Sequence, residues 1–382
     1  MVWKTIWVAA IEILLLCFAV DLVHAQGHPG LVHAAQTSSA VLPVGIVPPS
    51  LAGPSGDVSK NGDYNWSPAY AASGMDLLLE ATGDQKWAAG IVDWGEHILA
   101  ERDAISPTDQ RPYAWTDRST RVQSPYVWIA FTDHNFAPLM EFASYVLKHK
   151  ELGEKLHQGK PYRDYALAYM HEYTRALDID MAELARNGDR AYFRFAKRVP
   201  VANAKLNGQP LPVNMNAAMF TAMLYLANAE AAAGKPDVSH RLSALVADFV
   251  SYLKKDVFVS HACGDRTCID WRYCTYMPRA EDVGHANLTV KFLVDAHNNG
   301  YQVSRGDLVG VADTFDNLLD SNGKPKGNLL DGSSVPGVAN SIMYVMFLAN
   351  YSPTLKTKLE HVMADNRNFT YWGPWLKATG GG

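Results

Sequence analysis

The linkers between the predicted helices alternate in character, and this alternation restricts the fold more than any other feature of the sequence. Apolar residues recur at helical spacing in one segment after another, and almost no stretch has the alternating pattern of a strand. Short linkers, at residues 82–84, 234–237 and 300–304, join the two members of a helix pair, whereas long linkers join one pair to the next. The predicted helices span residues 68–81, 85–102, 136–148, 163–186, 216–233, 238–256, 286–299, 305–319, 338–350 and 352–365.

Short linkers make antiparallel neighbours, so the first helices of all pairs run one way and the second helices run back. The first helices have faces of small residues, as at Ala217 and Ala218, which suit the crowded inside of a ring. The second helices carry more charges, as at Lys254 and Lys255, which suit the outside. We therefore predict an all-α fold, an (α/α) toroid of about five to seven helical hairpins.

The same arrangement brings the long linkers and the N-termini of the inner helices to one face of the ring. Each helix N-terminus carries a partial positive charge of about half a unit and unpaired N–H groups, so a ring of them favours an anionic ligand. Polar residues recur at the expected starts of these helices, namely Asn65 with Trp66, His134 with Asn135, Asn214 with Asn216, and His285.

One large domain accounts for most of the chain. Residues 1–25 read as a signal peptide, with Lys4 at the charged end, an apolar run over 8–20 and a cleavage site at 23–25. The apolar run is shorter than the ~20 residues that a membrane span requires, so we expect a secreted protein, extracellular or periplasmic, with no membrane anchor. Residues 26–60 are predicted to form an extended leader, 61–376 a single toroid domain and 377–382 a flexible Gly-rich tail.

The charge balance argues against a general polyanion-binding surface. The net charge of −5 gives no global positive field for nucleic acid. A polyanion would need a local cluster of arginines, such as Arg118 and Arg121 in the linker over residues 103–135; the alternative is a solvated loop. The sequence contains no P-loop, GxGxxG or HExxH motif and no basic helical stripe. It therefore gives no support to nucleotide binding, metalloprotease activity or nucleic-acid binding, and we expect no cofactor.

Three of the four cysteines, Cys263, Cys268 and Cys274, lie close together in the linker over residues 257–285. Cys17 belongs to the signal segment. In an oxidising compartment we expect a disulfide between Cys263 and Cys268, closing a small loop and leaving Cys274 as a buried thiol. The spacing fits no CxxC pattern, so no metal site is predicted.

The segment over residues 271–287 holds the densest set of reactive side chains, including Tyr273, Tyr276, Arg279, Glu281 and His285. A linker that only connects helices has no need of such a set. A site that removes a proton from the carbon beside a carboxylate needs nearly all of it.

With these residues on the predicted layout, the chain resembles the (α/α)-toroid polysaccharide lyases that degrade alginate, glucuronan and related polyuronates, and is most similar to polysaccharide lyase family 38. The resemblance covers roughly residues 60–365. Toroid lyases of several families pair an Asn-His with an Arg and a Tyr from a later loop. Here the order is reversed at His134-Asn135, and the loop offers Arg266, Arg272 or Arg279 with Tyr273 or Tyr276, so individual roles stay open.

The resemblance implies a secreted lyase that cleaves a 1,4-linked polyuronate, glucuronan or mannuronate-rich alginate, by β-elimination. This reaction removes H5 and expels O4 after the carboxylate has been neutralised, and one preorganised donor contributes ~2.7–4 kcal/mol. Asn135, Arg279 and His285 are the expected donors. Tyr273 is the expected base, with His134 as the alternative. The expected substrate-binding residues are Asn65, Trp66, Arg118, Arg121, Asn214, Asn216, Tyr276 and Glu281.

Simpler roles exist for several of these residues. Asn214 and Asn216 are good helix N-caps, and Glu281 with Asp282 could cap the helix that follows. A glycoside hydrolase on the same fold would pair Glu281 or Asp282 with Asp133 or Asp117 at ~5–5.5 or ~6.5–9.5 Å. A uronate C5-epimerase would use nearly the lyase site, and a non-catalytic glycan-binding protein would lack a poised base.

Overall fold

The computed structural model describes residues 67–105, 112–117, 126–196, 206–329, 342–364, 366 and 368–380. The predicted signal segment and leader, and the candidate residues Asn65, Trp66, Arg118 and Arg121, lie outside the described residues. Predictions about them therefore stay predictions.

Five helical hairpins follow one another along the described chain. Their first members, the inner helices, are α3 (Ser67–Thr82), α5 (Ile129–Lys148), α8 (Val213–Ala232), α10 (Val283–Asn298) and the 3₁₀ helix η5 (Tyr344–Asn350). Their second members, the outer helices, are α4 (Gln85–Ala100), α7 (Tyr162–Asp180), α9 (Pro236–Tyr252), α11 (Arg305–Leu318) and α12 (Pro353–Ala364). A final helix, α13 (Phe369–Thr379), has no hairpin partner among the described residues.

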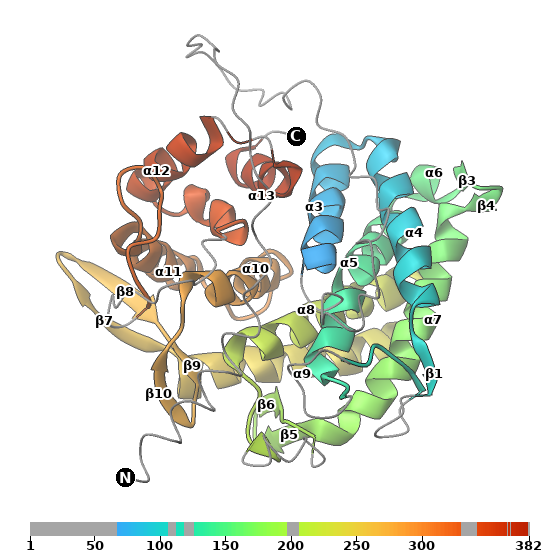
Figure 1. Ribbon diagram of the computed structural model, residues 1–382, viewed down its shortest axis with the longest axis horizontal. Coiled ribbons are helices and arrows are strands. Elements are labelled where there is room, and N and C mark those ends of the chain that lie inside the picture. Colours follow the sequence, from blue (N-terminus) through green and yellow to red (C-terminus); the bar gives the residue numbers. More distant parts are fainter. Residues whose placement is uncertain are drawn as a thin grey trace.

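The inner helices form a closed ring. Each contacts the next in the order α3, α5, α8, α10, η5, α13, and α13 packs back against α3. Figure 1 shows this ring, with α4, α7, α9, α11 and α12 around its outside. The predicted all-α toroid is confirmed. No helix in the described part of the chain is long and apolar enough to cross a membrane.

The burial patterns of the helices explain this layering. The outer helix α4 buries Trp87, Ile91, Trp94 and Ile98, which recur at helical spacing along one face, and exposes its other side. The inner helix α8 is buried on all sides over most of its length, as small and apolar residues permit. Phe220 of α8 stacks on Phe249 of α9 with ring centroids 4.2 Å apart, which fixes that hairpin.

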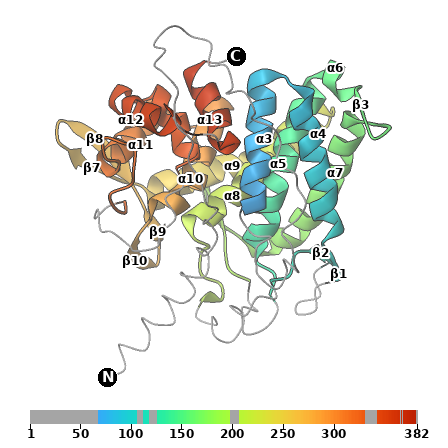
Figure 2. The same cartoon turned by 45° about the horizontal axis from the view of Figure 1, so that its top comes forward.

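The linkers contain short antiparallel hairpins that the sequence analysis did not predict. These are β1 (Asp103–Ile105) with β2 (Pro112–Ala114), β3 (Leu156–His157) with β4 (Lys160–Pro161), β5 (Leu184–Asn187) with β6 (Arg190–Phe193), β7 (Val259–Cys263) with β8 (Arg266–Asp270), and β9 (Arg272–Cys274) with β10 (Met277–Ala280). Figure 2 shows β1, β2, β9 and β10 below one end of the helices, with β3 and α6 (Lys150–Gly153) at the other end. The helix predicted over 163–186 is too long, because residues 184–187 pair with β6 instead.

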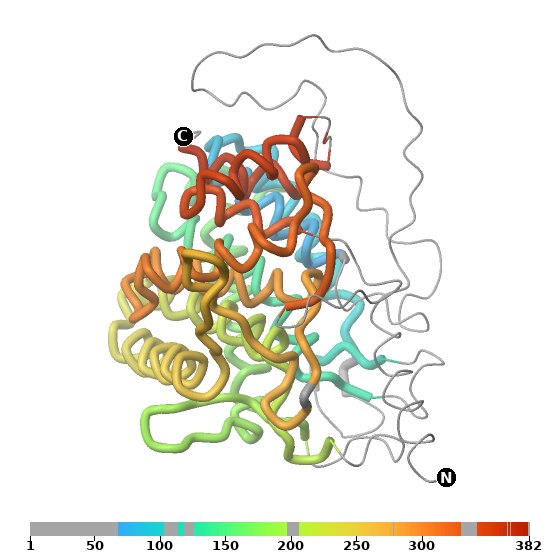
Figure 3. Tube along the Cα trace, turned by 90° about the vertical axis from the view of Figure 1, so that its left-hand side faces the viewer, coloured from blue at the N-terminus to red at the C-terminus, as the bar shows by residue number. Residues whose placement is uncertain are grey.

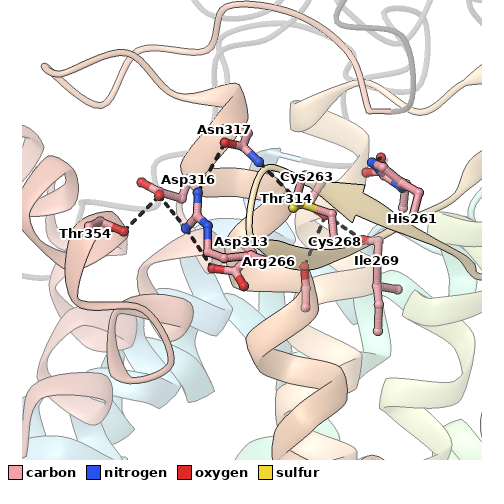
Figure 4. The surroundings of a disulfide bond; sticks show 12 residues. His261, Cys263, Arg266, Cys268, Ile269, Asp313, Thr314, Asp316, Asn317 and Thr354 are labelled. Atoms are coloured by element: carbon pink, nitrogen blue, oxygen red, sulfur yellow. Dashed lines mark hydrogen bonds and ion pairs between the residues drawn. A yellow bond between two sulfur atoms is a disulfide. The ribbon is translucent and has the colours of Figure 1, made fainter.

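The β7–β8 hairpin carries the predicted disulfide between Cys263 and Cys268, which is confirmed, and Cys274 is a buried free thiol. Arg266 extends from this hairpin to α11, where its Nη1 donates to Asp313 and Asp316, at 2.8 Å in both cases (Figure 4). Thr314 Oγ1 donates to the carbonyl of Ile269 at 2.9 Å. The hairpin is therefore fastened to the outer helix.

Helix α13 closes the ring and was missed in the sequence. Gly373 lies so near α3 that an added Cβ would stand 2.5 Å from Cβ of Leu77, so only glycine permits this approach. Lys377 of α13 pairs with Glu80 of α3. The predicted boundary at 376 consequently falls inside α13, and residues 377–379 belong to the helix rather than to a tail.

An ion network lies inside the ring, on the three neighbouring helices α5, α8 and α10 and on α3. Lys291 Nζ of α10 is 3.0 Å from Glu141 Oε1 of α5 and 2.8 Å from Asp295 Oδ2 one turn further along α10. Ser73 of α3 donates to the other oxygen of Glu141 at 3.2 Å. The Lys291 ammonium also lies 5.1 Å from the ring of Tyr225 on α8. We call Glu141, Lys291 and Asp295 the axial network.

Candidate active site

The first turns of the inner helices lie at the same end of the ring. Tyr70 in the first turn of α3 contacts His134 near the start of α5, and Ser73, further along α3, reaches Glu141, further along α5, so the two helices run parallel. His134 precedes Glu141 by seven residues and His285 precedes Lys291 by six. At 1.5 Å per residue, both histidines lie about 9–10 Å along their helices from the ion pair that joins them.

Figure 3 shows the same ring of helices from the side. The parallel inner helices agree with the predicted gathering of residues 134, 214 and 273–285 at one face of the ring, which stays a prediction for the side chains themselves. The linker lengths indicated this parallel direction of the inner helices.

The side chains of Tyr273, Arg279, Asp282 and His285 form one cluster, which we call the α10 cluster. The β9–β10 hairpin brings Tyr273 and Arg279 together, with the guanidinium 4.9 Å from the centre of the phenol ring. His285 meets the same ring edge-on, with centroids 5.0 Å apart. Tyr273 thus touches a cation on one side and an imidazole on the other.

Asp282 holds His285 in place. It is the N-cap of α10 and accepts from the backbone N–H of His285 at 2.9 Å, while its other oxygen bonds to Nδ1 of the His285 ring. Burial opposes ionisation of this carboxyl, but the charge and hydrogen bonds of His285 and the charge of Arg279 keep the pKa of Asp282 below its usual value. An ionised Asp282 fixes the proton of His285 on Nδ1, so proton exchange with a ligand would take place at Nε2.

Arg279 is the arginine of this linker that reaches the cluster. Arg266 is bound to α11, and Arg272 is exposed on β9. Arg279 Nη2 lies 3.7 Å from Asp282, and its Nη1 has no hydrogen-bond partner among the described residues. Of the two candidate tyrosines, Tyr276 is partly buried, and burial with the neighbouring Cys274 raises its pKa. Among the tyrosines and arginines that the sequence offers in this linker, Tyr273 and Arg279 are therefore the pair that lies in the cluster.

His134 and Asn135 lie about two turns further into α5 than the sequence indicated. The helix begins at Ile129, so the apolar residues 129–131 form its first turn. His134 is 3% exposed and packs edge-on against Tyr70, at 5.1 Å between ring centroids. Asn135 is fully buried, and neither polar atom of its amide has a hydrogen-bond partner in the described part of the chain. A buried amide without partners needs an explanation, and a ligand supplies one.

Asn214 and Asn216 differ in what their amides do. Neither caps α8, since Pro212 stands at the N-cap position. The Asn216 amide accepts from the N–H of Phe193 at 2.7 Å and donates to the carbonyl of Leu211 at 2.9 Å, which fastens the strand β6 to α8. We therefore leave Asn216 out of the site. The Asn214 side chain is buried, and its Oδ1 has no partner among the residues described.

Glu281 does not cap α10, because Asp282 occupies that position. Its side chain is fully buried, and its Oε2 accepts from Nε1 of Trp271 at 3.1 Å.

Sequence reasoning missed Tyr70, which lies beside His134, and Tyr344, which lies beside Tyr70. Tyr70 packs against both His134 and Tyr344, and the backbone N–H of Tyr344 donates to the Asn287 side chain of α10 at 3.0 Å. Tyr70 sits in the first turn of the first inner helix, so the rule that located the other polar helix starts would have found it. No group of three or more His, Cys, Asp or Glu side chains is placed to hold a metal ion within the described ranges.

No protein-family model and no curated protein sequence matches this chain. Among solved structures it is similar to a glycosyl hydrolase family 88 protein from Bacteroides vulgatus, at 13% sequence identity and a TM-score of 0.37, over 84% of this chain and 95% of that one. Function is therefore inferred from the geometry of the site itself.

Proposed function

We propose that this protein is a carbohydrate-active enzyme, and within that class a polysaccharide lyase that cleaves a 1,4-linked polyuronate by β-elimination. The observation that carries the proposal is the position of Tyr273, which contacts both the Arg279 guanidinium and the Asp282-bound imidazole of His285 at the start of an inner helix. We also propose that it acts outside the cytoplasm. The Cys263–Cys268 disulfide supports an oxidising compartment.

The cluster suits the two demands of the reaction. The uronate carboxylate must be neutralised before the neighbouring carbon can lose a proton, and Arg279, His285 and the partnerless amide of Asn135 are donors for it. Tyr273 Oη then takes H5, the C–H electron pair forms the C4=C5 double bond, and the C4–O4 bond breaks. In glucuronate and mannuronate H5 and O4 lie on one face, so Tyr273 returns the proton to O4.

The positive neighbour of Tyr273 favours the phenolate form that such a base requires. His134 is the alternative base, and its neighbour Tyr70 then orients it. The two assignments differ in which side chain faces H5.

A glycoside hydrolase on this ring is the second candidate, and each carboxyl that it would use has at least one oxygen in a hydrogen bond. Asp282 binds His285, Glu281 accepts from Trp271, Asp133 accepts from the Tyr173 hydroxyl, and Asp117 accepts from Nε1 of Trp128 at 3.1 Å. A C5-epimerase would use the lyase site and return the proton to C5 instead of O4.

A screen with glucuronan, polymannuronate, polyguluronate and pectate separates these functions. A lyase produces an unsaturated uronate that absorbs in the ultraviolet, a hydrolase produces reducing ends without that absorbance, and an epimerase exchanges H5 for solvent deuterium without cutting the chain. No absorbance on any of the polymers, in spite of proven binding, would exclude the lyase.

Tyr273→Phe tests the assigned base. Loss of the phenol should lower turnover by roughly 10²–10⁴-fold and leave substrate binding intact. Tyr276→Phe is the matched control from the same hairpin and should retain activity. Full activity in Tyr273→Phe would move the base to His134.

A further inference from the structure

We infer that Glu281 is held as a neutral carboxylic acid, and that its proton leaves Asp282 as the single negative charge facing His285 and Arg279. Glu281 is then a positioning residue for the α10 cluster and not a substrate ligand. What this means for turnover rests on the function proposed above, but the protonation state does not.

The contacts of Glu281 are those of a neutral group. Its side chain is fully buried, Oε2 accepts one hydrogen bond from the indole of Trp271, and Oε1 has no partner among the described residues. A buried carboxylate needs a cation or several donors, because burying an unpaired charge costs far more than burying a neutral acid. One neutral indole donor does not supply that.

On balance, the groups around Glu281 also favour its neutral form. Burial comes first and the adjacent charge of Asp282 second, and together they raise the pKa of Glu281 well above its usual value against the effects of Trp271 and Arg279. Cys274 is the other titratable neighbour, and burial raises its pKa to about 12, so it is an uncharged thiol near neutrality. Arg279 is shared with Tyr273 and Asp282 and is not dedicated to Glu281.

The neutral state has a consequence for the cluster. With Glu281 protonated, Asp282 alone balances His285 and Arg279, and the guanidinium stays over Tyr273. A second carboxylate beside Asp282 would attract Arg279 away from Tyr273 and hold a proton on His285 more tightly. The proton on Glu281 thus keeps the Arg279 guanidinium and the His285 imidazole available for the carboxylate of a ligand.

The test compares the imidazole titration of His285, followed by NMR, in the wild type and in Glu281→Gln. The amide has the size of the acid, can still accept from Trp271 and carries no charge. If Glu281 is neutral, the titration midpoint of His285 stays the same. If Glu281 is ionised, removing its charge lowers the midpoint by about one pH unit or more, and the inference is overturned. Asp282→Asn is the positive control, because it removes a charge in direct contact and must lower the midpoint.

A second measurement needs no variant. In wild-type protein labelled with ¹³C at glutamate side chains, the Cδ resonance of Glu281 should stay at the position of a protonated carboxyl through neutral pH, and the position of a carboxylate would contradict the inference. Activity then separates the two proposals. If Glu281 is neutral and the protein cuts no polyuronate, the lyase proposal fails and the inference about Glu281 stands. If Glu281 is charged and the protein is an active lyase, the inference fails and the lyase proposal stands.

Discussion

The axial network and the α10 cluster use the same kinds of side chain on the same helix, but they differ in how completely those side chains are paired. Lys291 is 3% exposed and has a carboxylate on each of two sides. In the α10 cluster, by contrast, Nη1 of Arg279 is left without a partner within the described residues, as is the amide of Asn135 near the N-terminal end of α5.

This difference separates structural charges from functional ones. A buried ion pair that is fully satisfied supports the fold, since each of its members would be expensive to bury alone. Buried polar atoms without partners cost free energy in the empty protein and regain it when a ligand supplies the missing groups. We therefore assign the ion pairs of Lys291 to stability and the N-terminal end of the ring to binding.

The largest expected effect is on stability and lies in the axial network. Lys291→Met should lower the free energy of unfolding by about 3–5 kcal/mol, because it leaves Glu141 and Asp295 buried without their cation. Urea denaturation measures this loss. Lys254→Met is the matched control, since Lys254 pairs with Asp307 at a partly exposed position, and it should cost at most about 1 kcal/mol. Equal losses in the two variants would remove the distinction between the regions.

The second effect is a pH dependence of stability that belongs to the same network. Burial, opposed by Lys291, raises the pKa of Glu141 from 4.5 to about 7, and burial with the charge of Glu141 raises that of Asp76. An acid whose pKa is raised by folding binds its proton more tightly in the folded state than in the unfolded state. Its contribution to stability is therefore complete below the unfolded value and is lost as pH rises through the folded value.

Unfolding free energies measured across this window should fall with rising pH, by roughly 3 kcal/mol at most for Glu141. Glu141→Gln keeps the neutral form at every pH and should flatten the fall. A slope that is unchanged in Glu141→Gln would show that other groups control it.

The ring could be predicted from the sequence because linker length determines which helices are antiparallel, and all ten predicted helices have helical counterparts in the structure. The short strands could not, because each consists of two to five residues and is held by pairing with its neighbour, as residues 184–187 show. Helix α13 was missed because Pro374 and Gly373 weaken its local signal, and its position depends on packing against α3.

For the site, the sequence indicated which residue types gather at one end, but not which atoms are already used. Asn214 and Asn216 cannot be told apart from the sequence, yet the Asn216 amide is hydrogen-bonded to the backbone of Phe193 and Leu211. Glu281 and Asp282 are adjacent carboxyls, yet one is enclosed beside Trp271 and the other caps α10. Such distinctions arise from tertiary contacts, which a single sequence does not display.

The smallest expected effect on stability comes from a pair of matched helix caps, and it sharpens the comparison most. Asp282 caps the inner helix α10 and Asp84 caps the outer helix α4, where it accepts from the N–H of Lys86 at 3.0 Å. Asp84→Ala should lower stability by about 0.5–2 kcal/mol, the usual cost of a lost cap, and Asp282→Ala should cost more, because it also removes the buried carboxylate that pairs with His285 and Arg279. Only Asp282→Ala should also lower turnover, by roughly 10²-fold, because His285 loses the carboxylate that orients its ring. Thermal unfolding and the polyuronate assay on both variants decide this, and equal activity in the two would show that the contact between Asp282 and His285 serves only the helix.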